Sequence, residues 1–79
     1  MQLKIEIDKK SIGGCLKTAR ELHGLTQEKL SEEMGCTSKY ISKVENGASA
    51  PSLPFVIKFS KITGSDLNYL LRGMYPKGE

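Results

Sequence analysis

Two lysines and two serines recur at the spacing of one helix face near the middle of the chain. Lys39 and Lys43 are four positions apart, so they share a face of a helix. Ser38 and Ser42 lie beside them, and the opposite face is apolar. A lysine can donate to O6 and N7 of guanine, and a serine hydroxyl can serve several bases weakly. These four residues are therefore the candidates for reading base edges in DNA.

A helix N-terminus and the distribution of charge add candidates for contact with phosphate. Gln27 stands at the first position of a predicted helix, where free backbone N–H groups attract phosphate. The chain has 12 basic and 9 acidic residues, a net charge of +3, and four of the acidic residues fall within residues 21–35. A protein that faces phosphate would turn this acidic block away from the nucleic acid and present Lys17, Lys39 and Lys43 on another face.

Two short helices joined by a glycine turn are predicted to position these side chains. Thr26 is a typical N-cap for a helix over residues 27–34. After a turn at Gly35, Thr37 is the N-cap predicted for a helix over residues 38–45. Two helices held at a fixed angle can place the second one in a DNA major groove. The segment therefore indicates sequence-specific DNA binding.

Three further helices are predicted from apolar spacing and capping signals. They cover residues 11–23, 53–62 and 66–72, with Ser11, Ser52 and Ser65 as the predicted N-caps. In the first of them, Ile12, Leu16, Ala19 and Leu22 form the buried stripe. Gly73 ends the last helix, and residues 74–79 are a predicted tail. A chain of 79 residues has room for one domain. We expect an all-α fold, a compact five-helix bundle over residues 11–73.

The first ten residues carry a different pattern. Leu3, Ile5 and Ile7 alternate with charged residues, and a period of two predicts a half-buried strand. A lone strand leaves its backbone groups unpaired, and no later segment has the pattern of a partner strand. The segment therefore pairs with its copy in a second subunit, caps the helical core, or is a loosely ordered tail.

Metal, cofactor and enzyme chemistry are not predicted. Cys15, Cys36 and the single histidine, His23, have neither the number nor the spacing of zinc ligands. The sequence has no phosphate-binding loop and no pattern of a nucleophile with its base. The cysteines are expected to be reduced thiols. The alternative is a redox switch at Cys36, because a helix N-terminus lowers a thiol pKa. With no signal peptide and no apolar run of about 18 residues, we expect a cytoplasmic protein that does not enter a membrane.

A set of landmarks runs in register from residue 12 to residue 71. They are Arg20, Gly24-Leu25-Thr26-Gln27-Glu28, Leu30, Gly35, Tyr40-Ile41-Ser42, Glu45-Asn46-Gly47, Pro51-Ser52 and Asp66-Leu67-Asn68-Tyr69-Leu70-Leu71. With these landmarks the chain resembles the lambda-repressor-like helix-turn-helix domain of the Cro and Xre type. The resemblance covers about 60 of the 79 residues.

The resemblance implies roles for particular residues. It implies that the helix over residues 38–45 enters the major groove and that Gln27 clamps the DNA backbone. Thr37, Tyr40 and Asn46 would add phosphate contacts, with a core position as the alternative for Tyr40.

The resemblance also implies a salt bridge. It pairs Arg20 with Glu45 as a buried or half-buried ion pair between the first and third helices. Neither Arg nor Gln stands at position 38, so we expect modest affinity for each half-site.

Together these features predict a homodimeric transcriptional regulator, a repressor that binds a partly palindromic operator in double-stranded DNA. The alternative is an antitoxin-like module that binds DNA and a small protein partner. Two surfaces compete as the dimer interface. One is the last helix, with Leu67, Tyr69, Leu70 and Leu71, and the other is the N-terminal strand.

Overall fold

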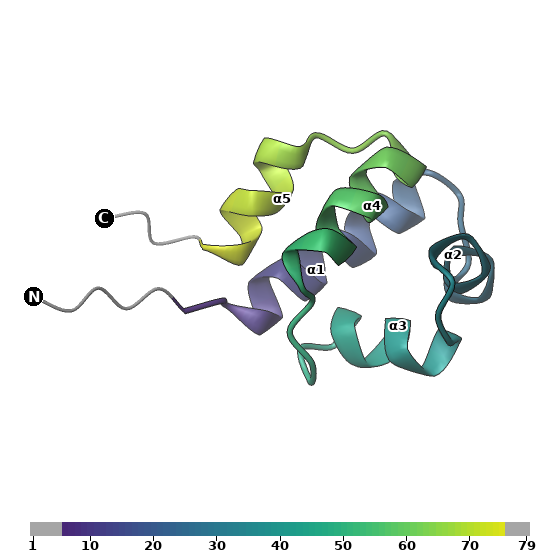
Figure 1. Cartoon of the computed structure of the whole chain (residues 1–79), viewed down its shortest axis with the longest axis horizontal. Coiled ribbons are helices and arrows are strands. Elements are labelled where there is room, and N and C mark those ends of the chain that lie inside the picture. The colour runs from purple at the N-terminus through teal and green to yellow at the C-terminus, as the bar shows by residue number, and fades with distance from the viewer. Residues whose placement is uncertain (1–5, 76–79) are drawn as a thin grey trace, which may run out of the picture.

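The computed structural model describes residues 6–75, which form five helices (Figure 1). The helices are α1 (Lys9–Leu22), α2 (Gln27–Met34), α3 (Ser38–Glu45), α4 (Leu53–Thr63) and α5 (Leu67–Met74). No strand forms within residues 6–75. The predicted all-α, five-helix architecture is therefore confirmed.

Three of the predicted N-caps explain where α2, α3 and α4 begin. The hydroxyls of Thr26, Thr37 and Ser52 each accept a hydrogen bond from the backbone N–H three residues later, at 3.0, 3.1 and 3.2 Å. Gly35 and Gly64 end α2 and α4 with φ of 75° and 74°, in the left-handed region that glycine adopts without steric cost. These local signals fix the short turn between α2 and α3.

The other two predicted N-caps are wrong. Asp8 caps α1 by accepting from the backbone N–H of Ser11 at 3.0 Å, so Ser11 lies inside the first turn. Asp66 caps α5, while the Ser65 hydroxyl instead lies 2.7 Å from the hydroxyl of Thr63. In both cases a carboxylate near the predicted serine accepts the capping bond, and a charged acceptor forms the stronger bond.

Two helices also end later than predicted. α4 runs through Thr63, and α5 continues through Gly73 to Met74. Gly73 does not have the positive φ of a helix-ending glycine, and a Cβ there would lie 2.8 Å from Sγ of Cys15. The lack of a side chain at Gly73 thus allows α5 to pack closely on α1. Met74 belongs to the core rather than to a tail, since it is 1% exposed.

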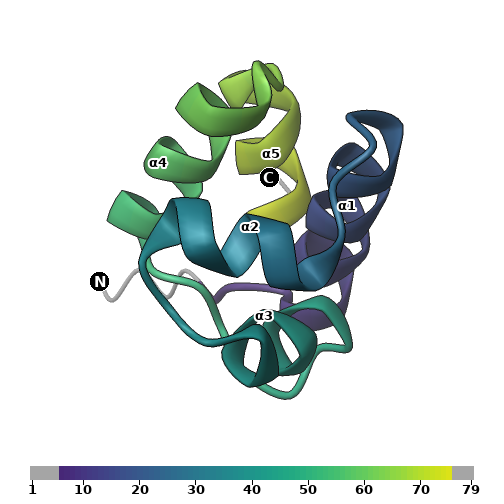
Figure 2. The ribbon, with the colours of Figure 1, turned by 90° about the vertical axis from the view of Figure 1, so that its right-hand side faces the viewer.

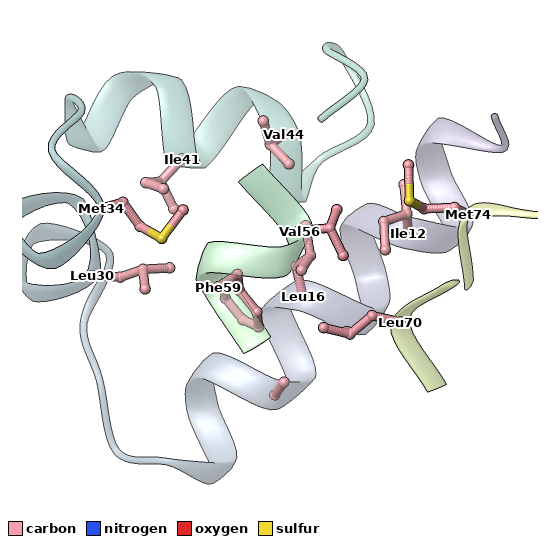
Figure 3. Packing of buried hydrophobic residues seen from close by; sticks show 11 residues of the cluster. Ile12, Leu16, Leu30, Met34, Ile41, Val44, Val56, Phe59, Leu70 and Met74 are labelled. Atoms are coloured by element: carbon pink, nitrogen blue, oxygen red, sulfur yellow. The ribbon is translucent and has the colours of Figure 1, made fainter. Parts of the chain in front are cut away.

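All five helices contribute to a single hydrophobic core (Figure 3). Its buried members are Ile12, Leu16, Ala19, Leu30, Met34, Ile41, Val44, Val56, Phe59, Leu70 and Met74. Leu22 was predicted to be buried on α1 but is 80% exposed. The buried stripe of α1 turns toward Arg20 instead, because each residue adds about 100° around a helix and Leu22 falls on the other side of Ala19.

The N-terminal segment contacts the end of α5. Leu3 and Ile5 of the predicted strand lie outside the described residues. Ile7 packs against the core, and the backbone N–H of Asp8 donates to the carbonyl of Met74 at 2.8 Å. For residues 6–8 these contacts match the alternative in which the segment caps the helical core.

No helix within residues 6–75 can cross a bilayer. The longest, α1, has 14 residues, whereas a transmembrane helix needs about 20 apolar residues.

Candidate nucleic-acid interface

α3 lies at one edge of the bundle, below α2 in Figure 2. Ile41 and Val44 anchor it in the core, each with 1% exposure. Its outer side carries the four candidate base-reading residues. Ser38, Lys39 and Lys43 are exposed, and Ser42 is half-buried. The fold thus leaves a polar, basic helix face uncovered next to a short turn.

The candidate phosphate contacts implied by the family resemblance also form hydrogen bonds and ring contacts at and near the ends of α3. The Thr37 hydroxyl accepts the capping bond, which leaves its own proton to donate elsewhere. Oδ1 of Asn46 accepts from the backbone N–H of Ala48 at 3.1 Å, and its NH2 group remains a donor. Tyr40 is half-buried, and its ring meets Phe55 edge-to-face with 5.8 Å between the ring centroids. Tyr40 therefore has a packing role, as its alternative interpretation suggests, beside any contact its hydroxyl makes.

An ion pair between α1 and α3 fixes the base of this surface. Nε of Arg20 donates to Oε2 of Glu45 at 2.7 Å, and Nη2 donates to Oε1 at 3.1 Å. The two side chains are 9% and 4% exposed, so the pair is buried. A third bond runs from Nη1 of Arg20 to the carbonyl of Leu25 at 2.7 Å. The hydrogen bond to Glu45 raises the pKa of Arg20 above its usual value although burial acts in the opposite direction, so the guanidinium stays charged near neutral pH.

Gln27 joins the same carboxylate from α2. Its Nε2 donates to Oε1 of Glu45 at 3.0 Å. A carboxylate only accepts hydrogen bonds, so this contact orients the amide, with one of its two N–H groups used and the other left to donate. Residues of α1, α2 and α3 therefore meet at Glu45. This third link could not be predicted from the sequence, because it depends on how the helices pack.

A glycine lets α1 approach α3 closely. A Cβ at Gly13 would clash with the carbonyl oxygen of Val44 and lie 2.8 Å from that of Glu45. Lys17 follows Gly13 by four residues and precedes Arg20 by three, so it lies along the side of α1 that borders α3. Lys17 is exposed there. Lys17, the candidate phosphate contact on α1, thus lies on the side of α1 next to α3.

The remaining chemical groups do not form a reactive site. Cys15 and Cys36 are free thiols. Burial raises the pKa of Cys36, and the nearby Lys58 acts in the opposite direction, so this environment favours the protonated thiol over the thiolate that a redox switch uses. Within residues 6–75 no three His, Cys, Asp or Glu side chains are placed to hold a metal ion.

Comparison with known sequences places this geometry among regulators. A model of the helix-turn-helix family matches residues 16–70. An uncharacterized HTH-type transcriptional regulator of Methanocaldococcus jannaschii is 41% identical over 49 residues, which cover 62% of this chain and 74% of the relative. The ImmF control region 10 kDa protein of Bacillus phage phi105 is 30% identical over 64 residues, which cover 81% and 71% of the two chains.

Solved structures agree with the sequence matches. The restriction-modification controller protein C.AhdI from Aeromonas hydrophila superposes with a TM-score of 0.74 and 28% identity, over 80% of this chain and 91% of that one. SinR, a master regulator for biofilm formation, superposes in its complex with DNA with a TM-score of 0.69 and 30% identity, over 76% and 97% of the two chains. SinR is also similar to this chain in its complex with the SinI protein.

Proposed function

The chain belongs to the helix-turn-helix family of Cro/Xre-type transcriptional regulators, and from this premise we propose that it is a homodimeric repressor that reads a partly palindromic operator. The uncovered outer side of α3 carries the proposal. Lys39 and Lys43 are exposed there, and neither forms an ion pair within residues 6–75. Their charges are available to a partner, and the acceptor atoms of guanine suit them.

The proposed contacts divide into two classes. Lys39 and Lys43 read bases, with Ser38 next and Ser42 contributing less. Phosphate is bound by Gln27, Thr37, Tyr40, Asn46 and Lys17. Phosphate contacts set the register of the protein on the duplex, and base contacts give the specificity.

The proposal of a dimer that represses by occupying DNA is consistent with the size of the module. Residues 6–75 form one bundle, and a single bundle covers about one half-site of an operator. Two copies related by a two-fold axis would cover both half-sites. Occupying the DNA excludes other proteins from it, which is the simplest way for such a module to regulate a promoter.

The first expected result is DNA binding that weakens steeply with salt. The purified chain should enrich a specific duplex from a random pool. The logarithm of its association constant for that duplex should fall linearly with the logarithm of the KCl concentration. The slope should be about −0.9 for each phosphate neutralised. Binding measured by fluorescence anisotropy at several KCl concentrations gives this slope. No enriched duplex, or affinity that is independent of salt, would exclude the proposal.

The outer side of α5 is the proposed dimer interface. Tyr69 and Tyr75 are 46% and 39% exposed, and Leu67 and Leu71 are half-buried. Substituting Tyr69→Glu places a charge in this surface and should halve the mass measured by light scattering. The matched control is Leu53→Glu, because Leu53 is 49% exposed but lies on α4.

A shortened chain tests the rival interface. It should begin at Glu6, since Asp8 caps α1 and Ile7 packs on the core. We expect this chain to remain a dimer. Loss of the dimer in the shortened chain, with Tyr69→Glu still dimeric, would assign the interface to the N-terminal segment instead.

A module that binds both DNA and a small protein is the second candidate. The similarity to SinR in its complex with SinI supports it. Co-purification of a stoichiometric small protein with the chain would favour this function.

A further inference from the structure

The start of α1 lies against the end of α3. Gly47 follows α3 with φ of 83°, and a Cβ there would lie 2.7 Å from Cγ and 3.2 Å from Cα of Lys10. The stem of Lys10 therefore passes directly over Gly47. A Cβ at position 47 would crowd this stem, and the positive φ independently favours glycine there.

Lys10 lies at the end of a row of two lysines and an asparagine on the outer side of α3. Lys39, Lys43 and Asn46 are spaced by four and three residues, so they follow one another along the outer side of the helix toward Gly47. Lys10 stands at the end of this row. It is exposed and makes no ion pair within residues 6–75. The row therefore ends in an uncompensated cation contributed by another helix.

Lys10 also shares a ridge of α1 with a candidate phosphate contact. Lys10 and Lys17 are seven residues apart, two helical turns, which separates their Cα atoms by about 10 Å along one side of α1. Gly13 lies between them and faces α3. Two exposed lysines thus border the seam where α1 meets α3.

We propose that Lys10 is an additional DNA phosphate contact, which extends the nucleic-acid interface from α3 onto the first turn of α1. The inference rests on the proposed function, since it names a further residue of the same interface. In the sequence, Lys10 falls within the first ten residues, for which no DNA contact is predicted. The structure places it in α1, where its flexible four-carbon stem carries a compact charge past the end of α3.

A purely structural role makes a different prediction. A cation near the C-terminus of a helix stabilises that helix through its dipole, and Lys10 is close to the end of α3. In that role, loss of the charge would lower protein stability and leave the salt dependence of DNA binding unchanged.

Lys10→Gln separates the two roles because it keeps most of the stem and removes the charge. Affinity is measured against KCl for the enriched duplex and for a random duplex, and thermal unfolding is followed in parallel. We expect the log–log slope to become less steep by about one per subunit, with an equal loss of affinity on both duplexes. The thermal midpoint should stay that of the unmodified chain. The matched control is Lys61→Gln, an exposed lysine in the last turn of α4, which should keep the original slope. The C-terminal end of α4 lies away from α3 (Figures 1 and 2).

The possible results test the Lys10 contact separately from the proposed DNA-binding function. An unmodified chain that enriches a duplex, together with a Lys10→Gln variant of unchanged slope and affinity, overturns the inference and leaves the proposed function standing. Lowered stability with an unchanged slope also overturns it, in favour of the structural role. If the unmodified chain binds no duplex, the proposed function fails and the inference fails with it.

Discussion

Glu45→Ala is expected to lower the free energy of unfolding by about 3–5 kcal/mol, because it leaves the buried guanidinium of Arg20 without its counter-ion. The guanidinium cannot shed its charge to relieve the cost, since arginine remains protonated in proteins. Gln27 loses its acceptor in the same variant. Urea unfolding followed by circular dichroism measures the loss.

Glu21→Ala is the matched control for this result. The Glu21 carboxylate lies 3.9 Å from Nη2 of Arg20, but its side chain is 58% exposed. A pair in which the carboxylate is exposed and 3.9 Å away contributes at most about 1 kcal/mol. If Glu45→Ala and Glu21→Ala unfolded at the same urea concentration as the unmodified chain, the buried pair would not be the link that stabilises α3 against α1.

The second large effect is expected on DNA affinity. Lys39→Ala and Lys43→Ala should each weaken binding to the enriched duplex by about 1–3 kcal/mol, roughly 5- to 150-fold, if each lysine reads a guanine. Both side chains are exposed, so the unfolding midpoint should change little. Anisotropy titrations with the enriched duplex and with single-base variants of it measure both affinity and specificity.

The comparison with Lys17→Gln shows whether these lysines read sequence. Lys17 is a proposed phosphate contact, so its loss should weaken binding to all duplexes by a similar factor. Loss of Lys39 or Lys43 should instead reduce the preference for the enriched duplex over its single-base variants. If the preference survived in the double variant, other residues would have to read the operator.

Local signals made the centre of the fold predictable. Thr26, Gly35 and Thr37 cap or end helices through contacts with residues close to them in the chain. Such contacts can be predicted without knowing how the helices pack. The caps at Asp8 and Asp66 were missed for a related reason. Each stands within three residues of a serine that can also cap, and in both cases the carboxylate accepts the capping bond instead of the hydroxyl. The Ser65 hydroxyl lies 2.7 Å from that of Thr63, a contact that is formed only in the folded chain.

The candidate site was predictable only in part. The polar side of α3 follows from periodicity alone, and the partnership of Arg20 and Glu45 came from the family resemblance. The close approach of α1 to α3 had no such signal. Gly13 and Gly14 are indistinguishable in the sequence, yet a Cβ at Gly13 would clash with the backbone of α3 while a Cβ at Gly14 would meet nothing within 4 Å. Only the packing of the helices separates them.

The backbone contact at Gly13 has a consequence for the proposed binding of an operator. α1 meets the carbonyl groups of Val44 and Glu45 with no side chain between them, so no soft layer lets α3 tilt or slide. If α3 is held rigidly, the DNA must change its shape to fit the helix. We therefore expect base pairs between the half-sites, which no side chain touches, to influence affinity through the energy needed to twist and bend them. The lack of a side chain at Gly13 would then make the sequence-dependent stiffness of the DNA contribute to specificity.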